Sequence, residues 1–232
     1  MPAPLLRGHV AALSENMPRE KRPGHATRQP AGMRHKGHLR MRTSEGCRKR
    51  RKRYDESGDA RYLTFSCFRN QPFLKSPRAC RWLAEAIEEA RTETPFDLWA
   101  WVFMPEHVHL LLRPRASIGV SEILSAIKVP VSKRIVGWLR REAPQFLPHL
   151  LDVQPNGKEF HRFWQRGGGY DRNIWSPAEL REKIAYMHNN PVRRGLVANP
   201  GDWAWSSYAA WETGVDEPMP IDRSTLPPLN AC

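Results

Sequence analysis

Two apolar segments separated by only two residues constrain the fold of this 232-residue chain more than any other feature. FDLWAWVFM (Phe96–Met104) and HVHLLLRP (His107–Pro114) have the composition of buried strands, and only Pro105 and Glu106 lie between them. So short a connection allows only an antiparallel hairpin, because a parallel pair of strands needs a crossover of a dozen or more residues. We therefore expect an antiparallel sheet built around this hairpin.

Two further segments carry strand patterns. The β-rich run Arg61–Phe68 predicts a first strand, one face of which carries Tyr62, Thr64, Ser66 and Phe68. Phe160–Gln165 predicts a later strand, which is followed by the glycine-rich loop Gly167–Asn173. The sheet is therefore expected to contain strands from both ends of the central region.

Helical spacing of apolar residues predicts helices over Ala79–Arg91 and Ser121–Arg141. Pro130 should kink and interrupt the second helix, because proline lacks a backbone donor and clashes with the preceding turn. A last helix is predicted to open at SPAE (Ser176–Glu179), which offers a capping serine, an early proline and the glutamate of a capping box. The order strand, helix, hairpin, helix, strand, helix predicts an α+β sandwich with helices packed on an antiparallel sheet.

The charge and the prolines divide the chain into three parts. Residues 1–54 hold 15 Lys and Arg against Glu15, Glu20 and Glu45, so nearly all of the formal net charge of +13 lies there. We expect a disordered basic leader over 1–57, with a later translation start left open, a single domain over 58–212 and an irregular proline-rich tail over 213–232. A basic leader alone supports contact with nucleic acid only weakly, since it attracts phosphates without reading sequence.

Cysteine spacing and hydropathy indicate the compartment. Cys47, Cys67, Cys80 and Cys232 form no CxxC pair, so neither a disulfide framework nor a structural zinc site is predicted. No apolar run approaches the roughly 18 residues that a membrane span needs. We expect a cytoplasmic protein with no membrane partner.

His107 and His109 are the first candidates for chemistry. Residues two apart in a strand project from the same face, so both imidazoles should point together while Val108 points into the core. Such a pair can bind one divalent cation if a third ligand or open positions complete the site. The alternative is one buried, hydrogen-bonded histidine beside one surface histidine.

The last helix supplies further candidates within REKIAYMHNNPVRRGLV. Tyr186 and Asn190 are four residues apart and should lie one helical turn from each other, with Lys183 on the same stripe. His188 falls on the far flank of the apolar face and is not expected at a metal. Taken alone, Tyr186 would be better explained as an amphipathic aromatic residue at the margin of the core with its hydroxyl in water.

Four ordered motifs, HVH after MPE, FWQRGGGYDRNI, YMHNNPVRRGLV and DWAWSSY, resemble those of the REP-associated tyrosine transposases, a branch of the single-tyrosine HUH (IS200-like) transposases. The resemblance implies a ferredoxin-like α+β fold that cuts and joins single-stranded DNA beside hairpins formed by REP-like palindromes. It implies that His107, His109 and Asn190 hold Mg²⁺ or Mn²⁺, and that Tyr186 is the nucleophile of a 5′-phosphotyrosine intermediate. It favours a monomer and leaves a dimer open.

Contacts with DNA are expected from cations near these motifs, namely Lys128, Lys133, Arg134, Arg166, Arg172, Lys183, Arg193 and Arg194. Trp164, Trp175, Trp203 and Trp205 could stack on unpaired bases, although tryptophans at this density are more often core residues.

Two other functions compete with DNA cleavage. The HxHxH pattern of histidine-triad nucleotide hydrolases is excluded because Leu111 occupies the third position. A hairpin-binding protein whose catalysis has lapsed remains the alternative.

Overall fold

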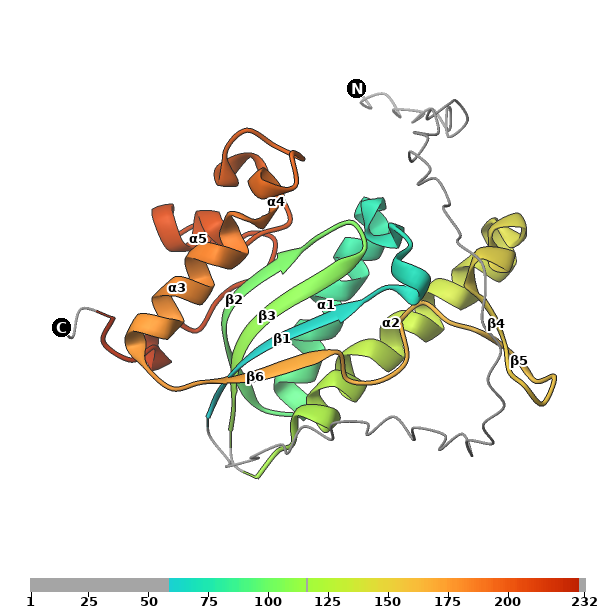
Figure 1. Ribbon diagram of the computed structural model, residues 1–232, viewed down its shortest axis with the longest axis horizontal. Helices are drawn as coiled ribbons and strands as arrows, with labels where there is room; N and C mark the ends of the chain where they lie inside the picture. The colour runs from blue at the N-terminus through green and yellow to red at the C-terminus, as the bar shows by residue number, and fades with distance from the viewer. Residues whose placement is uncertain (1–58, 116, 230–232) are drawn as a thin grey trace, which may run out of the picture. The chain divides into compact units, whose positions relative to one another are not determined.

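A four-stranded antiparallel sheet forms the centre of the computed structural model, which describes residues 59–115 and 117–229 (Figure 1). Its strands are β1 (Ala60–Ser66), β2 (Phe96–Phe103), β3 (His107–Pro114) and β6 (Tyr170–Ile174), in the order β2-β3-β1-β6. A separate two-stranded hairpin consists of β4 (Leu151–Val153) and β5 (Glu159–His161). This order of strands and the helices between them confirm the predicted ferredoxin-like α+β fold. The leader predicted over 1–57 lies outside the described residues.

The helices occupy both faces of the sheet. They are α1 (Pro77–Glu93), α2 (Val120–Glu142), α3 (Pro177–His188), α4 (Asn190–Arg193) and α5 (Tyr208–Thr213). Short 3₁₀ turns cover Phe68–Asn70, Phe73–Lys75, Pro144–Leu150, Pro200–Asp202 and Arg223–Thr225. None of these described helices has the length and apolarity to span a bilayer.

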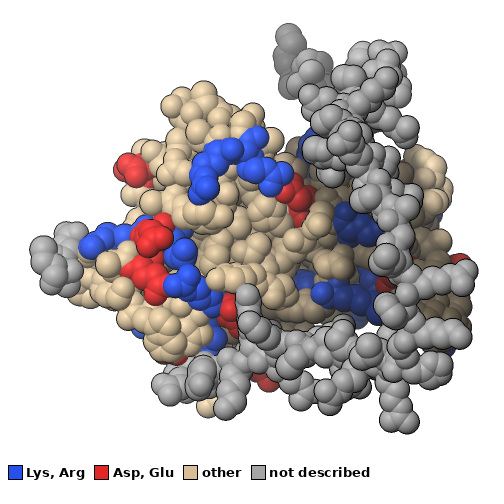
Figure 2. All heavy atoms as spheres, in the orientation of Figure 1, with Lys and Arg blue, Asp and Glu red and all other residues tan. Residues whose placement is uncertain are grey.

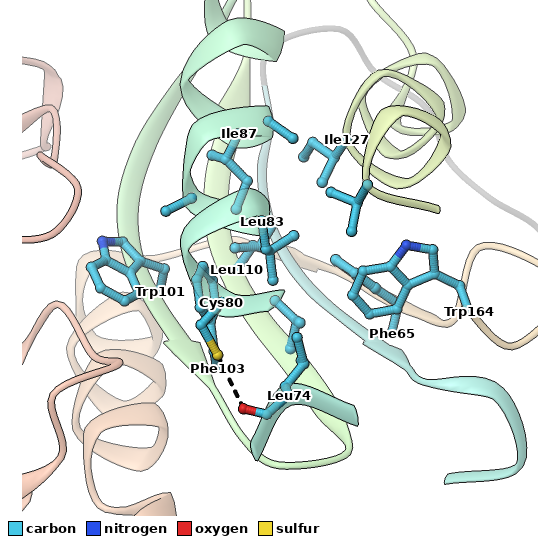
Figure 3. Close-up of a cluster of buried hydrophobic side chains, with 14 of the residues drawn as sticks. Phe65, Leu74, Cys80, Leu83, Ile87, Trp101, Phe103, Leu110, Ile127 and Trp164 are labelled. Carbon is cyan, nitrogen blue, oxygen red and sulfur yellow. Dashed lines mark hydrogen bonds between the residues drawn. The ribbon is translucent and has the colours of Figure 1, made fainter. Parts of the chain in front are cut away.

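The larger core lies between the sheet and the pair α1 and α2. Leu83 and Ile87 of α1 and Ile127 of α2 pack against Phe65 and Leu110 of the strands, all of them buried (Figure 3). The Cys80 thiol donates a hydrogen bond to the Leu74 carbonyl at 3.0 Å, which ties α1 to the turn that precedes it. Leu63 and Phe65 of β1, like Val108 and Leu110 of β3, are two residues apart, so side chains at alternate strand positions point into this core.

A second apolar cluster lies on the opposite face, under α3. Leu180, Ile184 and Met187 of that helix pack against Tyr62 of β1 and Leu111 of β3. Both faces of β3 are consequently buried, which explains why its sequence is a nearly continuous apolar run. His107 and His109 share the side of Leu111, so they lie between the sheet and α3.

The predicted hairpin is confirmed. β2 and β3 pair antiparallel with Phe103 opposite Val108 and Val102 opposite His109, and a register shift between Leu98 and Ala100 marks a bulge in β2. The first strand is also confirmed, with one error at its end. Phe68 lies in a 3₁₀ turn and does not share the face of Tyr62, because the strand already ends at Ser66.

α2 runs without interruption through Pro130, so the predicted break in this helix is wrong. Pro130 is exposed. The backbone carbonyl four residues earlier, which loses its helical donor, therefore lies on the solvent side, where water can hydrogen-bond to it. The buried residues Ile127 and Val131 on the opposite side hold the helix against α1 and the sheet.

The segment between α2 and α3 differs most from the prediction. β5 is shorter than the strand predicted over 160–165 and pairs with β4, for which no strand was predicted. The predicted glycine loop contains β6, which pairs with β1 so that Tyr170 lies opposite Thr64. Gly169 permits this pairing, since its φ of +80° brings its backbone against the Thr64 carbonyl.

We expect Gly169→Ala to destabilise the protein by about 3 kcal/mol, because a Cβ there would lie far inside van der Waals contact with the Thr64 carbonyl, at a backbone angle that alanine also disfavours. Gly167→Ala is the matched control: its φ is +87°, but no atom lies within 4 Å of the added Cβ, so the expected loss is only about 1 kcal/mol. Denaturant unfolding of both variants measures the difference. Equal losses would show that the close approach costs nothing.

The last helix begins at its predicted cap, whereas the segment predicted as a tail packs against the sheet. The Ser176 hydroxyl accepts from the Glu179 amide at 3.1 Å, although the Glu179 carboxylate accepts from the Trp175 amide and not from that of Ser176. Part of the tail predicted as irregular packs on the sheet, where Met219 is fully buried. There the Asp222 amide donates to the Leu98 carbonyl at 2.8 Å.

Candidate active site

His107 and His109 point to the same side of the sheet and meet. Their Nε2 atoms are 2.9 Å apart, and their rings are perpendicular with centroids separated by 4.6 Å. Val108 points the other way and is buried against α1 and α2. The geometry that the HVH spacing predicted, with both imidazoles on one face, is therefore present. His109 is buried and hydrogen-bonded, as the alternative also expected of one histidine, and His107 is half-buried.

Two hydroxyls of β1 contact the His109 ring at Nδ1, the nitrogen that faces away from His107. Its Nδ1 lies 2.8 Å from the Tyr62 hydroxyl and 3.0 Å from the Thr64 hydroxyl. These contacts arise because Thr64 and His109 are directly opposite each other in the sheet. A proton on Nδ1 donates to these oxygens and leaves a lone pair on Nε2, which faces the other members of the site.

Asn190 joins the two histidines from the opposite wall. Its side-chain amide lies 2.8 Å from His109 Nε2, and the residue is 9% exposed. Rotation of this amide presents its oxygen in place of its nitrogen. The two Nε2 atoms and the Asn190 amide thus form one cluster of three potential metal ligands between the sheet and the helix.

Tyr186 and Asn190 do not share one regular helix, contrary to the prediction. α3 ends at His188, Asn189 caps it, and α4 starts at Asn190, because Pro191 has no amide hydrogen to continue the helical bonding. The Asn189 backbone remains right-handed, and its amide donates to the Ala185 carbonyl at 3.0 Å. The chain therefore keeps winding, and both side chains still face the histidines.

Tyr186 lies at the mouth of the cluster. Its ring is 6.4 Å from the His109 ring and perpendicular to it, and its side chain is 38% exposed. Lys183 Nζ and Arg193 Cζ lie 5.5 Å and 5.1 Å from the centre of the Tyr186 ring. An exposed phenol thus lies beside two cations and the histidine pair.

Burial keeps both imidazoles neutral at pH 7. It lowers the pKa of His109 to about 3, and the neighbouring His107 adds to the effect. Burial also lowers the pKa of His107, and Arg194 adds to this effect while Glu106 opposes it. Neutral imidazoles have the lone pairs that a cation needs. Burial raises the pKa of Tyr62 to about 12, so this phenol keeps its proton.

Three residues of the site were not predicted from the sequence: Tyr62, Thr64 and Glu106. The Glu106 carboxylate lies 3.1 Å from His107 Nδ1 and 2.8 Å from Arg194 NH1. It therefore orients His107 as the two hydroxyls orient His109. Strand alternation grouped Tyr62 with Thr64, but only the pairing of β1 with β3 brings them to His109.

The cations predicted to contact DNA fall into separate groups. Lys183, Arg193 and Arg194 surround the site, whereas Lys128, Lys133 and Arg166 line a groove beside α2. Arg134 and Arg172 form ion pairs elsewhere, with Glu85 and Glu179 respectively. Figure 2 shows Lys and Arg side chains over the α4 region and, separately, beside α2.

The remaining candidates lie outside the cluster. Trp164 is buried and its indole donates to the Lys128 carbonyl, Trp203 and Trp205 are half-buried, and Trp175 is 66% exposed. His188 is buried and its Nε2 lies 3.0 Å from the Ser207 hydroxyl, and its absence from a metal site stays a prediction.

Two imidazoles and one amide are a donor set that fits a divalent cation and leaves coordination positions open. Among the described residues no group of three or more His, Cys, Asp and Glu could hold a metal ion. A cation at the histidine pair would therefore depend on the amide oxygen of Asn190 as the third protein ligand.

Comparisons with known proteins bear on these residues. The family described as Transposase IS200 like matches residues 63–150, which include both histidines and end before Tyr186. The REP-associated tyrosine transposase of Escherichia coli is 25% identical over 127 residues, which are 54% of this chain and 62% of that protein. A Haemophilus influenzae relative with the same family name is 26% identical over 124 residues, 53% of this chain and 65% of that protein.

The chain spans just under two thirds of the length of these two relatives. A solved structure of a REP-associated tyrosine transposase bound to a REP hairpin has a TM-score of 0.53 and 23% identity, covers 68% of this chain and 81% of its own, and shares the fold. Residues 63–150 thus match the family described as Transposase IS200 like, and the chain is similar to the REP-associated tyrosine transposases.

Proposed function

We propose that this protein cleaves and rejoins single-stranded DNA beside a hairpin, as the catalytic part of DNA transposition. The observation that carries the proposal is the meeting of an exposed phenol, Tyr186, with two neutral imidazoles and the amide of Asn190. The relationship to IS200-like transposases supports it. A structural role alone would not require His107 and His109 to face each other under α3.

We propose that the Nε2 atoms of His107 and His109 and the amide oxygen of Asn190 hold Mg²⁺ or Mn²⁺. When bound, such a cation polarises the scissile phosphodiester and offsets the charge that develops on its oxygens. Mn²⁺ should serve at least as well as Mg²⁺, because imidazole nitrogen is a softer ligand than the oxygen that Mg²⁺ prefers. Tyr62, Thr64 and Glu106 orient the two imidazoles.

Tyr186 is the proposed nucleophile. Its hydroxyl oxygen attacks the phosphorus and loses its proton, the bond from phosphorus to the 3′ oxygen breaks, and that oxygen takes up a proton. The DNA is left with a free 3′ hydroxyl and a 5′ end esterified to Tyr186. Because the ester keeps the energy of the broken bond, another 3′ hydroxyl can attack it and reseal the strand without a nucleotide cofactor. Lys183 and Arg193 lie where they can offset phosphate charge.

The proposed partner is single-stranded DNA that carries a hairpin, of the kind that REP-like palindromes form. The related structure contains a REP hairpin, and we extend that class of DNA to this chain. We also propose that one copy of the chain suffices, because Tyr186, His107, His109 and Asn190 all come from one protomer.

The test is the covalent intermediate itself. Purified protein incubated with Mn²⁺ and a hairpin-bearing single strand, labelled on the 3′ side of the cleavage position, should give a slow-migrating protein–DNA band on a denaturing gel. The fully paired duplex of the same sequence is the control and should give no band, since its bases are not free. Binding of the hairpin without any adduct would favour the lapsed hairpin-binding protein.

A further inference from the structure

We infer that a basic groove beside α2 holds the sugar-phosphate backbone of the paired stem of the hairpin, while the tyrosine site holds only unpaired DNA. The inference rests on the proposed function and adds a second, distinct binding surface to it. The groove consists of two adjoining hollows of about 270 and 320 Å³. Lys128, Val129 and Gly167 line both hollows, so the two are continuous.

The cations of the groove are concentrated in the larger hollow, which shares Lys128 with the smaller one. Its lining includes Lys128, Lys133, Arg162 and Arg166, and none of the residues that line either hollow is an aspartate or a glutamate. Asp152 pairs with Arg162 and Arg166 without lining the groove, so it holds both guanidinium groups in place. Lys133 makes no ion pair with a described residue and is exposed. A concave surface with one sign of charge concentrates a polyanion.

Hydroxyl groups supplement the cations. Ser121 and Ser125 line one hollow and Ser132 lines the other, all on α2. Serine hydroxyls are common donors to phosphate oxygens, and they carry no preference for base sequence. The groove thus offers several hydrogen-bond donors to the phosphate oxygens of a backbone.

The groove is fixed relative to the tyrosine site. Lys128 Nζ donates to the Gly167 carbonyl at 2.8 Å and lies 3.4 Å from the Gln165 carbonyl, which braces the glycine segment against α2. Two residues further on, Gly169 lies against the Thr64 backbone, and the Thr64 hydroxyl contacts His109. A short, braced segment therefore connects the groove with the histidine pair, so one DNA molecule can occupy both surfaces.

The aromatic residues decide which part of the DNA lies where. Phe163 and Trp164 line the groove but are only 2% and 5% exposed, so neither ring can stack on an unpaired base. Tyr170 and Tyr186 near the histidines are 39% and 38% exposed. Unpaired bases need ring faces, whereas a paired stem presents mainly phosphates. The stem therefore fits the groove, and the single strand fits the tyrosine site.

The double variant Lys133→Ala/Arg166→Ala tests the inference. Binding is measured by fluorescence anisotropy in EDTA, so that no cleavage occurs. The two probes are a stem-loop with a fully paired stem and an unpaired strand of the same length. We expect the double variant to bind the stem-loop at least about tenfold more weakly and to lose about two units of salt slope, as two lost phosphate contacts require. Its affinity for the unpaired strand should change less than twofold.

Arg134→Ala is the matched control, because it removes one exposed cation from the same helix but from the side that pairs with Glu85. It should leave binding of both probes unchanged. Equal losses on the two probes, or a double variant that binds the stem-loop like the wild type, would overturn the inference. Failure of the proposed cleavage is distinguishable, because it would remove the covalent adduct and leave stem-loop binding intact.

Discussion

Tyr186→Phe should abolish the covalent protein–DNA adduct and lower cleavage of hairpin-bearing single strands by at least about a thousandfold. The substitution removes only the oxygen that attacks phosphorus. The Tyr186 hydroxyl has no hydrogen-bond partner among the described residues, and its side chain is 38% exposed, so the loss of this oxygen should hardly change stability. DNA binding should likewise persist, since both neighbouring cations remain. The adduct is measured with labelled DNA on a denaturing gel.

Tyr170→Phe provides the matched control for this experiment. Tyr170 is 39% exposed and lies edge-on to Tyr62 at 5.9 Å, as Tyr186 does at 6.5 Å. It comes from β6, however, and has no metal-ligand candidate one turn away. The control variant should form the adduct at the wild-type yield. An undiminished adduct in Tyr186→Phe, or its loss in Tyr170→Phe, would assign the attack to another group.

The parts of this molecule that follow from local periodicity could be predicted from the sequence. Strand alternation placed both histidines on one face, and the two-residue connection fixed the β2–β3 hairpin, because both depend only on neighbouring residues. The capping serine of α3 is likewise a local signal. The contacts of Tyr62 and Thr64 with His109 are not local: they require the register of β1 against β3, which a single sequence does not reveal.

Tertiary pairing also explains the errors. The three glycines at 167–169 favour a loop, yet β6 forms directly after them because β1 offers an unpaired edge and Gly169 lets the backbones approach. The contact of Arg194 with Glu106 was not predicted, whereas its contact with DNA stays a prediction. Its pairing with Glu106 depends on how α4 approaches the β2–β3 turn, and no spacing in the sequence encodes that distance.

His109→Ala should weaken binding of Mn²⁺ at least about a hundredfold and reduce adduct formation by a similar or larger factor, because it removes one of the three proposed protein ligands. The residue is 4% exposed, so the variant also loses packing and the contacts with Tyr62 and Thr64, at a cost of about 2 kcal/mol in stability. Free Mn²⁺, measured by electron paramagnetic resonance during titration, reports the affinity independently of activity. His107→Ala, at a more exposed side chain, should give the same loss of Mn²⁺ with less loss of stability.

His188→Ala separates loss of the ligand from loss of packing. His188 is also 4% exposed and also accepts or donates one buried hydrogen bond, to Ser207, but it lies away from the histidine pair. Its substitution should cost a comparable amount of stability and leave the affinity for Mn²⁺ within about twofold of the wild type, because no proposed ligand is removed. If His109→Ala and His107→Ala bind Mn²⁺ as tightly as His188→Ala does, the two imidazoles do not hold the cation, and a different role for their convergence must be sought.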